Sequence, residues 1–380
     1  MLHTGIHWAA VVGQERVRDT LSAAFAHHTL GHAYLFSGID GSGKMATAIE
    51  LAMAVLCEHP DAVPCRECES CKKVLSGTHT DVHCVLPVCL EKEYKSSGGD
   101  LSEKGWAHLS EQIQAAFAEP YRLREFKGVP AIPVEWVKEI NHAILRGGVS
   151  SGKTVAIIDG IDIMNKESAN ALLKTLEEPP PGTHIILLTD RMQAVLPTII
   201  SRCQVLRFGA VPDTEVRRAL EEKYGNSKER TIIDDAVRYA MGSVGRALYL
   251  CEQPAGDYAG VAGNLLTACR SGSLLDCAAI TDAIETHDDM DYHRRVLMHI
   301  IFLIRGGFLG KLLTTETYID GTMSAYGHTG GRQVSVADCT MTERIFDACQ
   351  DALASIQAYG NTGLVWAHFI IKLTEILHGK

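Results

Sequence analysis

A glycine-rich sequence that ends in a lysine is suited to binding phosphate groups. Residues 38–44 read Gly-Ile-Asp-Gly-Ser-Gly-Lys and fit the pattern GxxxxGK, in which backbone N–H groups approach phosphate oxygens and the lysine reaches the β- and γ-phosphates. A chance glycine-rich turn is the alternative, but a short apolar run precedes the loop and a helical pattern follows it, as this motif requires. We therefore predict a nucleotide site that includes Gly38, Gly41, Ser42, Gly43 and Lys44.

Two positions that ATP hydrolysis needs are altered. Met45 stands where a serine or threonine hydroxyl normally coordinates magnesium, and a thioether is a poor ligand for that hard cation. Residues 154–159, TVAIID, provide the Walker B strand and end in Asp159, but Gly160 stands where hydrolysing proteins carry a water-activating glutamate. We expect Asp162 to be solvated or to cap a helix rather than replace that base. The sequence allows ATP or ADP to bind but predicts no efficient hydrolysis.

Four of the 12 cysteines lie close together in the sequence. Two successive CxxC steps let thiolates converge on one tetrahedral zinc ion, and four protein ligands leave no open position. Unligated thiols, or ligation by His79 or His83, are the alternatives. We predict a structural zinc site formed by Cys57, Cys65, Cys68 and Cys71.

Strands and helices must bring these residues together. The apolar runs Ala33–Phe36, Thr154–Asp159 and His184–Thr189 are short and predict buried strands. Residues 44–57 and 166–178 have helical spacing, and a run of prolines ends the second helix. Strands that alternate with helices indicate a parallel α/β sheet.

The rest of the chain divides into an insertion and a helical half. Residues 88–131 mix charges with a Ser-Ser-Gly-Gly turn at 96–99 and a helix near 109–117, which we interpret as an insertion on the α/β core. After Phe208 strand-like runs nearly cease, and helical patterns predict an all-α C-terminal half. These patterns cover residues 213–223, 232–241, 274–286, 292–309 and 342–359.

The composition is that of an ordinary globular protein, with 46% apolar and 22% charged residues in a chain of 380. No segment is apolar over the roughly 18 residues that a membrane span requires, and there is no export signal, so we expect a cytoplasmic protein. A reducing compartment favours metal ligation or burial of the cysteines over disulfides. The formal net charge of -10 argues against independent DNA binding, because affinity for phosphates comes from clustered lysines and arginines.

Together these motifs resemble the clamp-loader branch of the AAA+ proteins. The similarity runs from about Trp8 to Phe208. It includes Val-Gly-Gln at 12–14, HAYLFSG at 32–38, the cysteine cluster, SANALLKTLEEPP at 168–180 and LPTIISRCQ at 196–204. The Ser-Arg-Cys motif is highly specific to this branch. The resemblance implies an α/β AAA+ P-loop NTPase core with a parallel sheet and flanking helices, a small helical lid domain and an all-α C-terminal collar domain.

The resemblance also implies roles for single residues. Arg202 is similar to an arginine finger, which reaches the ATP site of a neighbouring subunit. Thr189 occupies the sensor position at the end of the fourth strand, and Arg246 looks like the second sensor. Val11 and Val12 fall where the family packs the adenine. The expected nucleotide site therefore comprises Val11, Val12, Gly38, Gly41, Ser42, Gly43, Lys44, Met45, Asp159, Thr189 and Arg246.

Three domains and several partners follow from the resemblance. We expect residues 1–208 to form the core, with a zinc-binding insertion at 57–71 and the further insertion at 88–131. Residues 209–255 would form the lid, and residues 256–380 the collar. The expected partners are clamp-loader subunits of the gamma/tau and delta types, with the sliding clamp and primed DNA as parts of the complex.

The altered positions distinguish between subunit types. Motor subunits of this branch keep both the hydroxyl residue and the glutamate, whereas delta-prime-type subunits commonly lack both but retain the arginine finger and the cysteine cluster. Met45 and Gly160 therefore predict a delta-prime-type subunit of the DNA polymerase III assembly rather than a gamma/tau-type motor. A small-molecule kinase would explain Lys44 but not the Ser-Arg-Cys motif. A zinc-ribbon module that binds nucleic acid alone does not fit the acidic balance.

Overall fold

The structure is a computed structural model of the chain. It describes residues 5–59, 63–89, 94, 101–124, 126, 130–149, 151–252, 258–286, 292–293, 295–301, 303–304, 336–357 and 361–379. The chain divides between residues 253 and 254 into two compact units. Within the described residues, no helix is long and apolar enough to cross a membrane.

A five-stranded sheet with the order β2-β3-β4-β1-β5 forms the centre of the first unit. All neighbouring strands pair in parallel. The carboxyl ends of β1, β3 and β4 therefore meet at one edge, which is where ligands bind in such sheets. These three strands confirm the predicted ones, whereas β2 and β5 were not expected. The bounds are β1 (Ala33–Ser37), β2 (Val82–Val85), β3 (Thr154–Asp159), β4 (Thr183–Thr189) and β5 (Gln204–Arg207).

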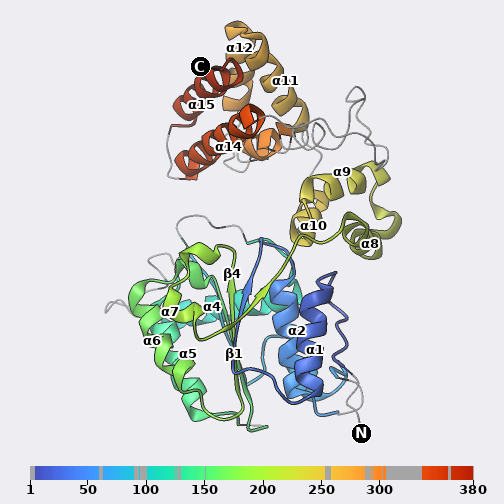
Figure 1. Cartoon of the computed structure of the whole chain (residues 1–380), viewed down its shortest axis with the longest axis vertical. Coiled ribbons are helices and arrows are strands. Elements are labelled where there is room, and N and C mark those ends of the chain that lie inside the picture. The colour runs from blue at the N-terminus through green and yellow to red at the C-terminus, as the bar shows by residue number, and fades with distance from the viewer. Residues whose placement is uncertain are drawn as a thin grey trace. The chain divides into compact units, whose positions relative to one another are not determined.

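Helices cover both faces of this sheet (Figure 1). Strands β3 and β4 are buried along nearly their whole length, which explains why they read as continuous apolar runs. One side of the sheet carries α1 (Glu15–Ala26) and α2 (Lys44–Leu56), and the other carries α5 (Val134–Arg146), α6 (Lys166–Glu177) and α7 (Pro197–Ile200). Helices α2 and α6 confirm the predicted helices at 44–57 and 166–178. A short helix, α3 (Glu69–Leu75), follows the cysteine loop.

The predicted insertion contributes a helix and an irregular segment. Helix α4 (Glu103–Ala118) confirms the helix expected near 109–117 and is longer, because Ser102 caps it by accepting the N–H of Gly105 at 3.2 Å. After α4 the chain runs through Tyr121–Arg124 without helix or strand. The expected turn at 96–99 lies outside the described residues.

Helices follow the last strand. The first unit continues with α8 (Asp213–Tyr224), α9 (Arg230–Ala240) and α10 (Val244–Glu252), of which α8 and α9 confirm the predicted helices. Single turns of 3-10 helix stand at η2 (Ile161–Ile163), η3 (Met192–Ala194) and η4 (Gly225–Ser227).

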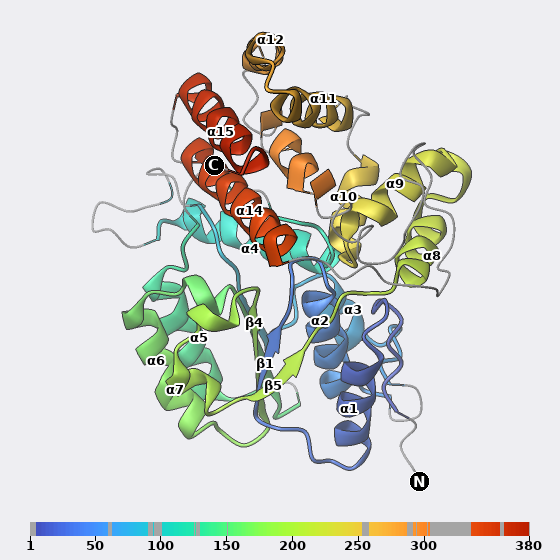
Figure 2. The same cartoon turned by 45° about the horizontal axis from the view of Figure 1, so that its top comes forward.

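The second unit is helical throughout its described residues. It contains α11 (Tyr258–Ser271), α12 (Leu274–Glu285), α14 (Val336–Gln357) and α15 (Thr362–Leu377), and the described residues between 292 and 304 are also helical. Figure 2 shows α14 and α15 side by side. This unit has its own hydrophobic core, which includes Cys349, Trp366 and Phe369. Residues 305–309 of one predicted helix lie outside the described part. The predicted α/β core followed by a helical C-terminal region is confirmed.

Candidate nucleotide site and metal centre

The phosphate loop lies between β1 and α2. Gly41 and Gly43 have φ values of +72° and +99°, which residues with a side chain rarely adopt. Gly38 is required by space, because an added Cβ would lie 2.6 Å from the carbonyl oxygen of Phe208. The hydroxyl of Ser42 is buried, without a hydrogen-bond partner among the described residues. Backbone conformation at Gly41 and Gly43 and close packing at Gly38 therefore favour glycine at these three positions.

The ammonium group of Lys44 is held by the loop itself. It donates to the carbonyl oxygens of Gly38 and Ile39, both at 2.8 Å, and pairs with the carboxylate of Asp190 at 2.7 Å. Asp190 directly follows β4. The lysine charge is thus neutralised by a carboxylate from the same edge of the sheet.

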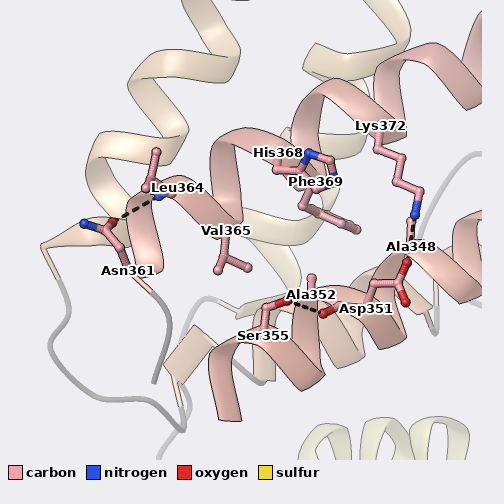
Figure 3. A pocket seen from close by; sticks show the side chains of 10 residues that line it. All are labelled: Ala348, Asp351, Ala352, Ser355, Asn361, Leu364, Val365, His368, Phe369 and Lys372. Carbon is pink, nitrogen blue, oxygen red and sulfur yellow. Dashed lines mark hydrogen bonds and ion pairs between the residues drawn. The ribbon is translucent and has the colours of Figure 1, made fainter. Parts of the chain in front are cut away.

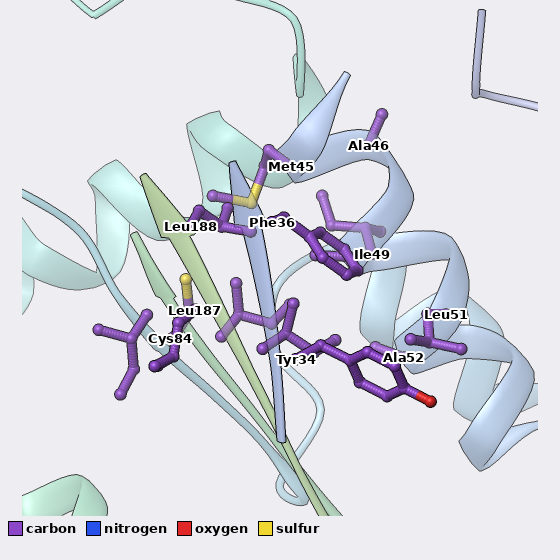
Figure 4. Packing of buried hydrophobic residues seen from close by; sticks show 14 of the residues in the cluster. Tyr34, Phe36, Met45, Ala46, Ile49, Leu51, Ala52, Cys84, Leu187 and Leu188 are labelled. Carbon is purple, nitrogen blue, oxygen red and sulfur yellow. The ribbon is translucent and has the colours of Figure 1, made fainter. Parts of the chain in front are cut away.

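The side chain of Met45 belongs to the hydrophobic core. It is 8% exposed, and Figure 4 shows it directed from α2 toward β1 and β4, near Phe36 and Leu188. The flexible thioether fills the space between helix and sheet. It offers no oxygen ligand to a magnesium ion.

Gly160 has no side chain to act as a base, and its backbone conformation would not accommodate a glutamate. Its φ is +72°, and an added Cβ would lie 2.5 Å from Cγ of Pro87. The neighbouring Asp159 accepts the Gly160 N–H with Oδ1 at 2.8 Å, while its Oδ2 pairs with Arg124. Both carboxylate oxygens of the Walker B aspartate are therefore in use within the chain.

The side chain of Asp162 is only 6% exposed, contrary to the expected solvated position. Its carboxylate accepts the hydroxyl of Thr189 at 2.9 Å and pairs with Nε of Arg191 at 3.1 Å. The Thr189 oxygen in turn accepts the N–H of Arg191 at 3.0 Å. The predicted sensor hydroxyl is thus fixed by these two residues, and Asp162 serves as its acceptor.

The segment before α1 meets a residue that the sequence analysis did not single out. The N–H of Val12 donates to the phenol oxygen of Tyr121 at 2.8 Å, and Val11 beside it is buried. An added Cβ at Gly43 would lie 3.0 Å from the same oxygen. Burial raises the pKa of Tyr121 to about 12, so the phenol is uncharged at neutral pH. Tyr121 therefore lies between the predicted adenine position and the phosphate loop.

Arg124 also comes from the segment after α4 and contacts the other end of the site, through the ion pair with Asp159. Desolvation lowers the pKa of this guanidinium from its ordinary value, and the nearby carboxylates of Asp40 and Asp190 act in the opposite direction. Three acidic side chains thus surround the two cations Arg124 and Lys44.

The start of α10 docks on the phosphate loop. The hydroxyl of Ser243 donates to the carbonyl oxygen of Asp40 at 2.7 Å, and the N–H of Gly245 donates to that of Gly41 at 3.0 Å. The backbone N–H of Arg246 donates to Ser243 Oγ at 3.1 Å. The helix that carries the predicted second sensor therefore begins at the loop.

The four predicted zinc ligands converge. Their Sγ atoms all lie within 4.8 Å of one another, and those of Cys65 and Cys71 are 4.0 Å apart. Four thiolates at the usual Zn–S distance of about 2.3 Å would be about 3.8 Å apart. Cys57 follows α2, Cys68 caps α3 and Cys71 lies in α3, so two helices fix three of the positions. The donor set fits a closed, structural zinc site.

Backbone N–H groups in the cysteine loop donate to sulfur. Cys65 donates to Cys57, Cys68 to Cys65 and Cys71 to Cys68, at 3.4, 3.3 and 3.4 Å. Burial acts to raise the pKa of Cys65, but the N–H groups of Cys68 and Glu67 and the neighbouring thiols lower it to about 6. Burial raises the pKa of the Cys57 and Cys71 thiols. Hydrogen bonds of this kind favour the thiolate, which is the form that binds metal.

The alternative histidine ligands are not in this cluster. Nε2 of His79 lies 3.0 Å from the hydroxyl of Ser70, and its Nδ1 accepts the N–H of Asp81 at 3.0 Å. Both ring nitrogens are therefore used in the fold. Among the described residues, the group of potential metal ligands contains neither His79 nor His83.

An ion pair with a buried carboxylate ties the cysteine loop to the segment before α1. Arg66 pairs with Glu50 of α2, whose side chain is 0% exposed. The same carboxylate oxygen accepts the N–H of Ala10 at 2.7 Å. The cysteine loop thereby helps to position the residues that lead into Val11 and Val12.

Arg202 lies at the protein surface just after α7. Its Nη2 pairs with Glu177 of α6 at 2.5 Å, and its Nη1 donates to the carbonyl oxygen of Thr198 at 2.9 Å and to Ser201 Oγ at 3.2 Å. The side chain is 33% exposed. In the described part of the chain, these bonds hold Arg202 to α6 and α7 and not to the phosphate loop. Glu177 was not singled out from the sequence, although it stands in the SANALLKTLEEPP motif.

The second unit has a pocket of about 300 Å³ between α14 and α15 (Figure 3). Lys372 and Asp351, an ion pair at 2.8 Å, are among its lining residues, together with Phe369 and His368. None of the predicted site residues lines this pocket.

Comparisons with known proteins identify relatives of this chain. A family model described as DNA polymerase III, delta subunit, matches residues 13–212, more than half of the chain. The delta' subunit of DNA polymerase III from Bacillus subtilis is 32% identical over 210 residues, 55% of this chain and 52% of that protein. The tau subunit from the same organism is 33% identical over 199 residues, 52% of this chain and 28% of that protein. These matches span about half or less of the relatives' own length.

Solved structures resemble the chain more distantly. A DNA polymerase III gamma-subunit-related protein from Thermotoga maritima has a TM-score of 0.39 and 15% identity, over 94% of this chain and 99% of that one. A RuvB mutant from the same organism has a TM-score of 0.39 and 15% identity, over 80% of this chain and 82% of that one. The phosphate loop, the parallel sheet and the family match over residues 13–212 concern the same part of the molecule. The chain therefore belongs to the DNA polymerase III delta-subunit family.

Proposed function

We propose that this chain is a delta-prime-type subunit of a DNA polymerase III clamp loader. It hydrolyses ATP weakly or not at all, and it supplies Arg202 as an arginine finger to the ATP site of a neighbouring gamma/tau-type subunit. Its partners are clamp-loader subunits of the gamma/tau and delta types, and the complex loads the sliding clamp onto primed DNA. Relatives of both subunit types match the chain, so the choice between them rests on its own residues.

Two positions support this choice over a gamma/tau-type motor. Met45 packs in the core and provides no hydroxyl for magnesium. Gly160 has a positive φ and lies close to Pro87, so this backbone does not accommodate the glutamate of a hydrolysing site. An isolated motor subunit would hydrolyse ATP, whereas this chain is expected not to.

The surface position of Arg202 is the observation that carries the proposal. Its guanidinium is partly exposed, yet it is oriented by Glu177, Ser201 and a backbone carbonyl. During phosphoryl transfer, negative charge grows on oxygens that a planar guanidinium contacts in a fixed geometry, and a finger of this kind contributes a factor on the order of 10³ to 10⁵. An arginine held at the surface by its own subunit is suited to act on another chain.

We also propose a structural zinc ion at Cys57, Cys65, Cys68 and Cys71. The domain boundaries proposed with this function are residues 1–208 for the core, 209–255 for the lid and 256–380 for the collar. The zinc ion would hold the cysteine loop and α3 in place and would take no part in ATP hydrolysis.

The test is the Arg202→Ala variant in a loader reconstituted with its motor subunits. We expect normal assembly and zinc content but a sharp drop in the ATPase rate that DNA and clamp stimulate, limited to the one site that faces this subunit. Arg202→Lys should rescue little, because an ammonium group lacks the bidentate geometry. The matched control is Arg207→Ala, which removes an exposed arginine from β5 and should change nothing. A mutant loader that assembles and hydrolyses ATP at the wild-type rate would show that this role is wrong.

A further inference from the structure

The segment Tyr121–Arg124 occupies the space around the phosphate loop on two sides. Tyr121 is 9% exposed, and its phenol oxygen lies 3.0 Å from the position that a Cβ on Gly43 would take. On the other side, a Cβ on Gly245 would lie 2.2 Å from the Tyr121 carbonyl oxygen and 3.0 Å from a methyl carbon of Leu123. The segment is therefore enclosed between the last glycine of the loop and the first turn of α10.

Tyr121 occupies the backbone hydrogen-bond donor at the predicted adenine position. Its phenol oxygen accepts the N–H of Val12 at 2.8 Å. An adenine, whose ring nitrogens N1, N3 and N7 accept hydrogen bonds, would have to displace the phenol to reach this donor.

Arg124 neutralises the carboxylate that would otherwise be free to bind a magnesium ion. Its guanidinium pairs with Asp159, the acidic residue at the end of the Walker B strand. Lys44 is in turn paired with Asp190 and bonded to two loop carbonyls. A nucleotide would have to break both ion pairs, and its magnesium would meet an arginine at its protein ligand. The residues present at this site therefore do not fit a bound nucleotide.

We propose that Tyr121–Arg124 is a built-in occupant of the nucleotide pocket, with Tyr121 in place of the base and Arg124 in place of the metal ion, and that the chain binds neither ATP nor ADP. The segment belongs to the 88–131 insertion, to which it gives a role. The proposal goes beyond the subunit type and does not depend on Arg202. It concerns binding by this chain alone, whereas the arginine finger acts on another chain.

The test is nucleotide titration of the full-length chain with magnesium, followed by calorimetry and by fluorescence of a labelled ADP. Wild-type protein should show no saturable binding at about 1 mM nucleotide. The opened variant Tyr121→Ala/Arg124→Ala should bind, with an affinity gain of at least about tenfold over the wild-type limit. Adding Lys44→Ala to that variant should abolish the binding, which would place the ligand at the phosphate loop.

Two further variants separate filling of the pocket from general damage. Arg122→Ala removes an arginine of the same segment that is exposed and pairs only with Glu119 in the described structure, and it should remain unable to bind. Tyr121→Phe keeps the ring but loses the acceptor for Val12, and it should still exclude nucleotide. Arg124→Ala alone keeps the packing of Tyr121 and should gain weaker binding if the double variant does not fold.

Either of two results would overturn the proposal. The first is saturable binding of ATP or ADP to wild-type protein that Lys44→Ala removes. The second is a folded opened variant, with a wild-type circular dichroism spectrum, that still binds no nucleotide, because something other than this segment would then exclude it. Neither result would bear on the trans ATPase test of Arg202.

Discussion

Glu177 and Arg202 form an ion pair of 2.5 Å between the end of α6 and the residue that follows α7. The two residues come from separate sequence motifs, SANALLKTLEEPP and Ser-Arg-Cys. The pair fixes one edge of the guanidinium while the Thr198 carbonyl and Ser201 hydroxyl fix the other. Glu177 is therefore a positioning residue for the proposed arginine finger.

Glu177→Ala should weaken the action of Arg202 without removing it. In a reconstituted loader we expect the stimulated kcat for ATP to fall by about three- to tenfold, less than the loss caused by Arg202→Ala. The KM for ATP should not change, because this chain does not hold the substrate. Stability should also be unaffected, since exposed ion pairs contribute little. An unchanged kcat would mean that the ion pair has no positioning role.

Elemental analysis should find about one zinc ion per chain in protein purified under reducing conditions. Cys68→Ser should lower this content and the melting temperature, and a strong chelator should do the same to wild-type protein. Cys84→Ser, which changes a buried cysteine outside the cluster, is the control for zinc content. A folded, metal-free protein that is indifferent to chelator would contradict the zinc site.

Arg66→Ala should destabilise the chain by about 3 kcal/mol, the low end for a broken buried pair because Arg66 is partly exposed. The loss arises because Glu50 would remain buried without its cation. Lys73→Ala, in the neighbouring helix α3, breaks an exposed pair with Glu69 and should leave the free energy of unfolding unchanged. Chemical denaturation of the three proteins decides the matter, and equal stabilities would refute the argument.

Restoring the two altered catalytic positions should not create an ATPase. Met45→Ser provides a hydroxyl, but Gly160→Glu places a side chain at φ +72° against Pro87 and should cost about 1–3 kcal/mol of stability. We expect no turnover from the double variant by a phosphate-release assay. Turnover at the rate of a working motor would favour the gamma/tau assignment instead.

Acid should destabilise the first unit through His184. Burial lowers the pKa of this histidine below 6.5, although a bond with the Gly31 carbonyl partly offsets the effect. The unfolded chain then takes up a proton before the folded one, so stability is complete above the unfolded pKa and decreases as pH falls through it. His184→Gln should flatten the dependence of the free energy of unfolding on pH between about 5 and 7. Parallel curves for both proteins would exclude this contribution.

The sequence predicted those parts of the fold whose residues are buried on all sides. Strands β1, β3 and β4 lie in the middle of the sheet, so their apolar runs were recognisable. The edge strands β2 and β5 bury less of their surface, and Val-His-Cys-Val and Gln-Val-Leu-Arg have no continuous apolar run. Their pairing partners, rather than their own residues, make them strands.

The candidate site was predictable where contacts are local. The loop glycines, Lys44 and the cysteine cluster are set by spacing within a few residues, and the structure places each group together. Tyr121 reaches Val12 across 109 positions, and no periodicity records such a contact. The sequence did contain a signal. The insertion has a tyrosine followed by two arginines, and the predicted site is rich in aspartates with which an arginine could pair.

An occupant joined covalently to its own pocket does not obey mass action as a free ligand does. The tether keeps Tyr121 and Arg124 at an effective concentration on the order of millimolar or higher, whatever the metabolic state of the cell. A rise or fall in the ATP-to-ADP ratio would change the nucleotide bound by the proposed gamma/tau-type neighbours but not the occupancy of this pocket. The proposed complex would thus contain one subunit whose pocket does not respond to the energy charge of the cell.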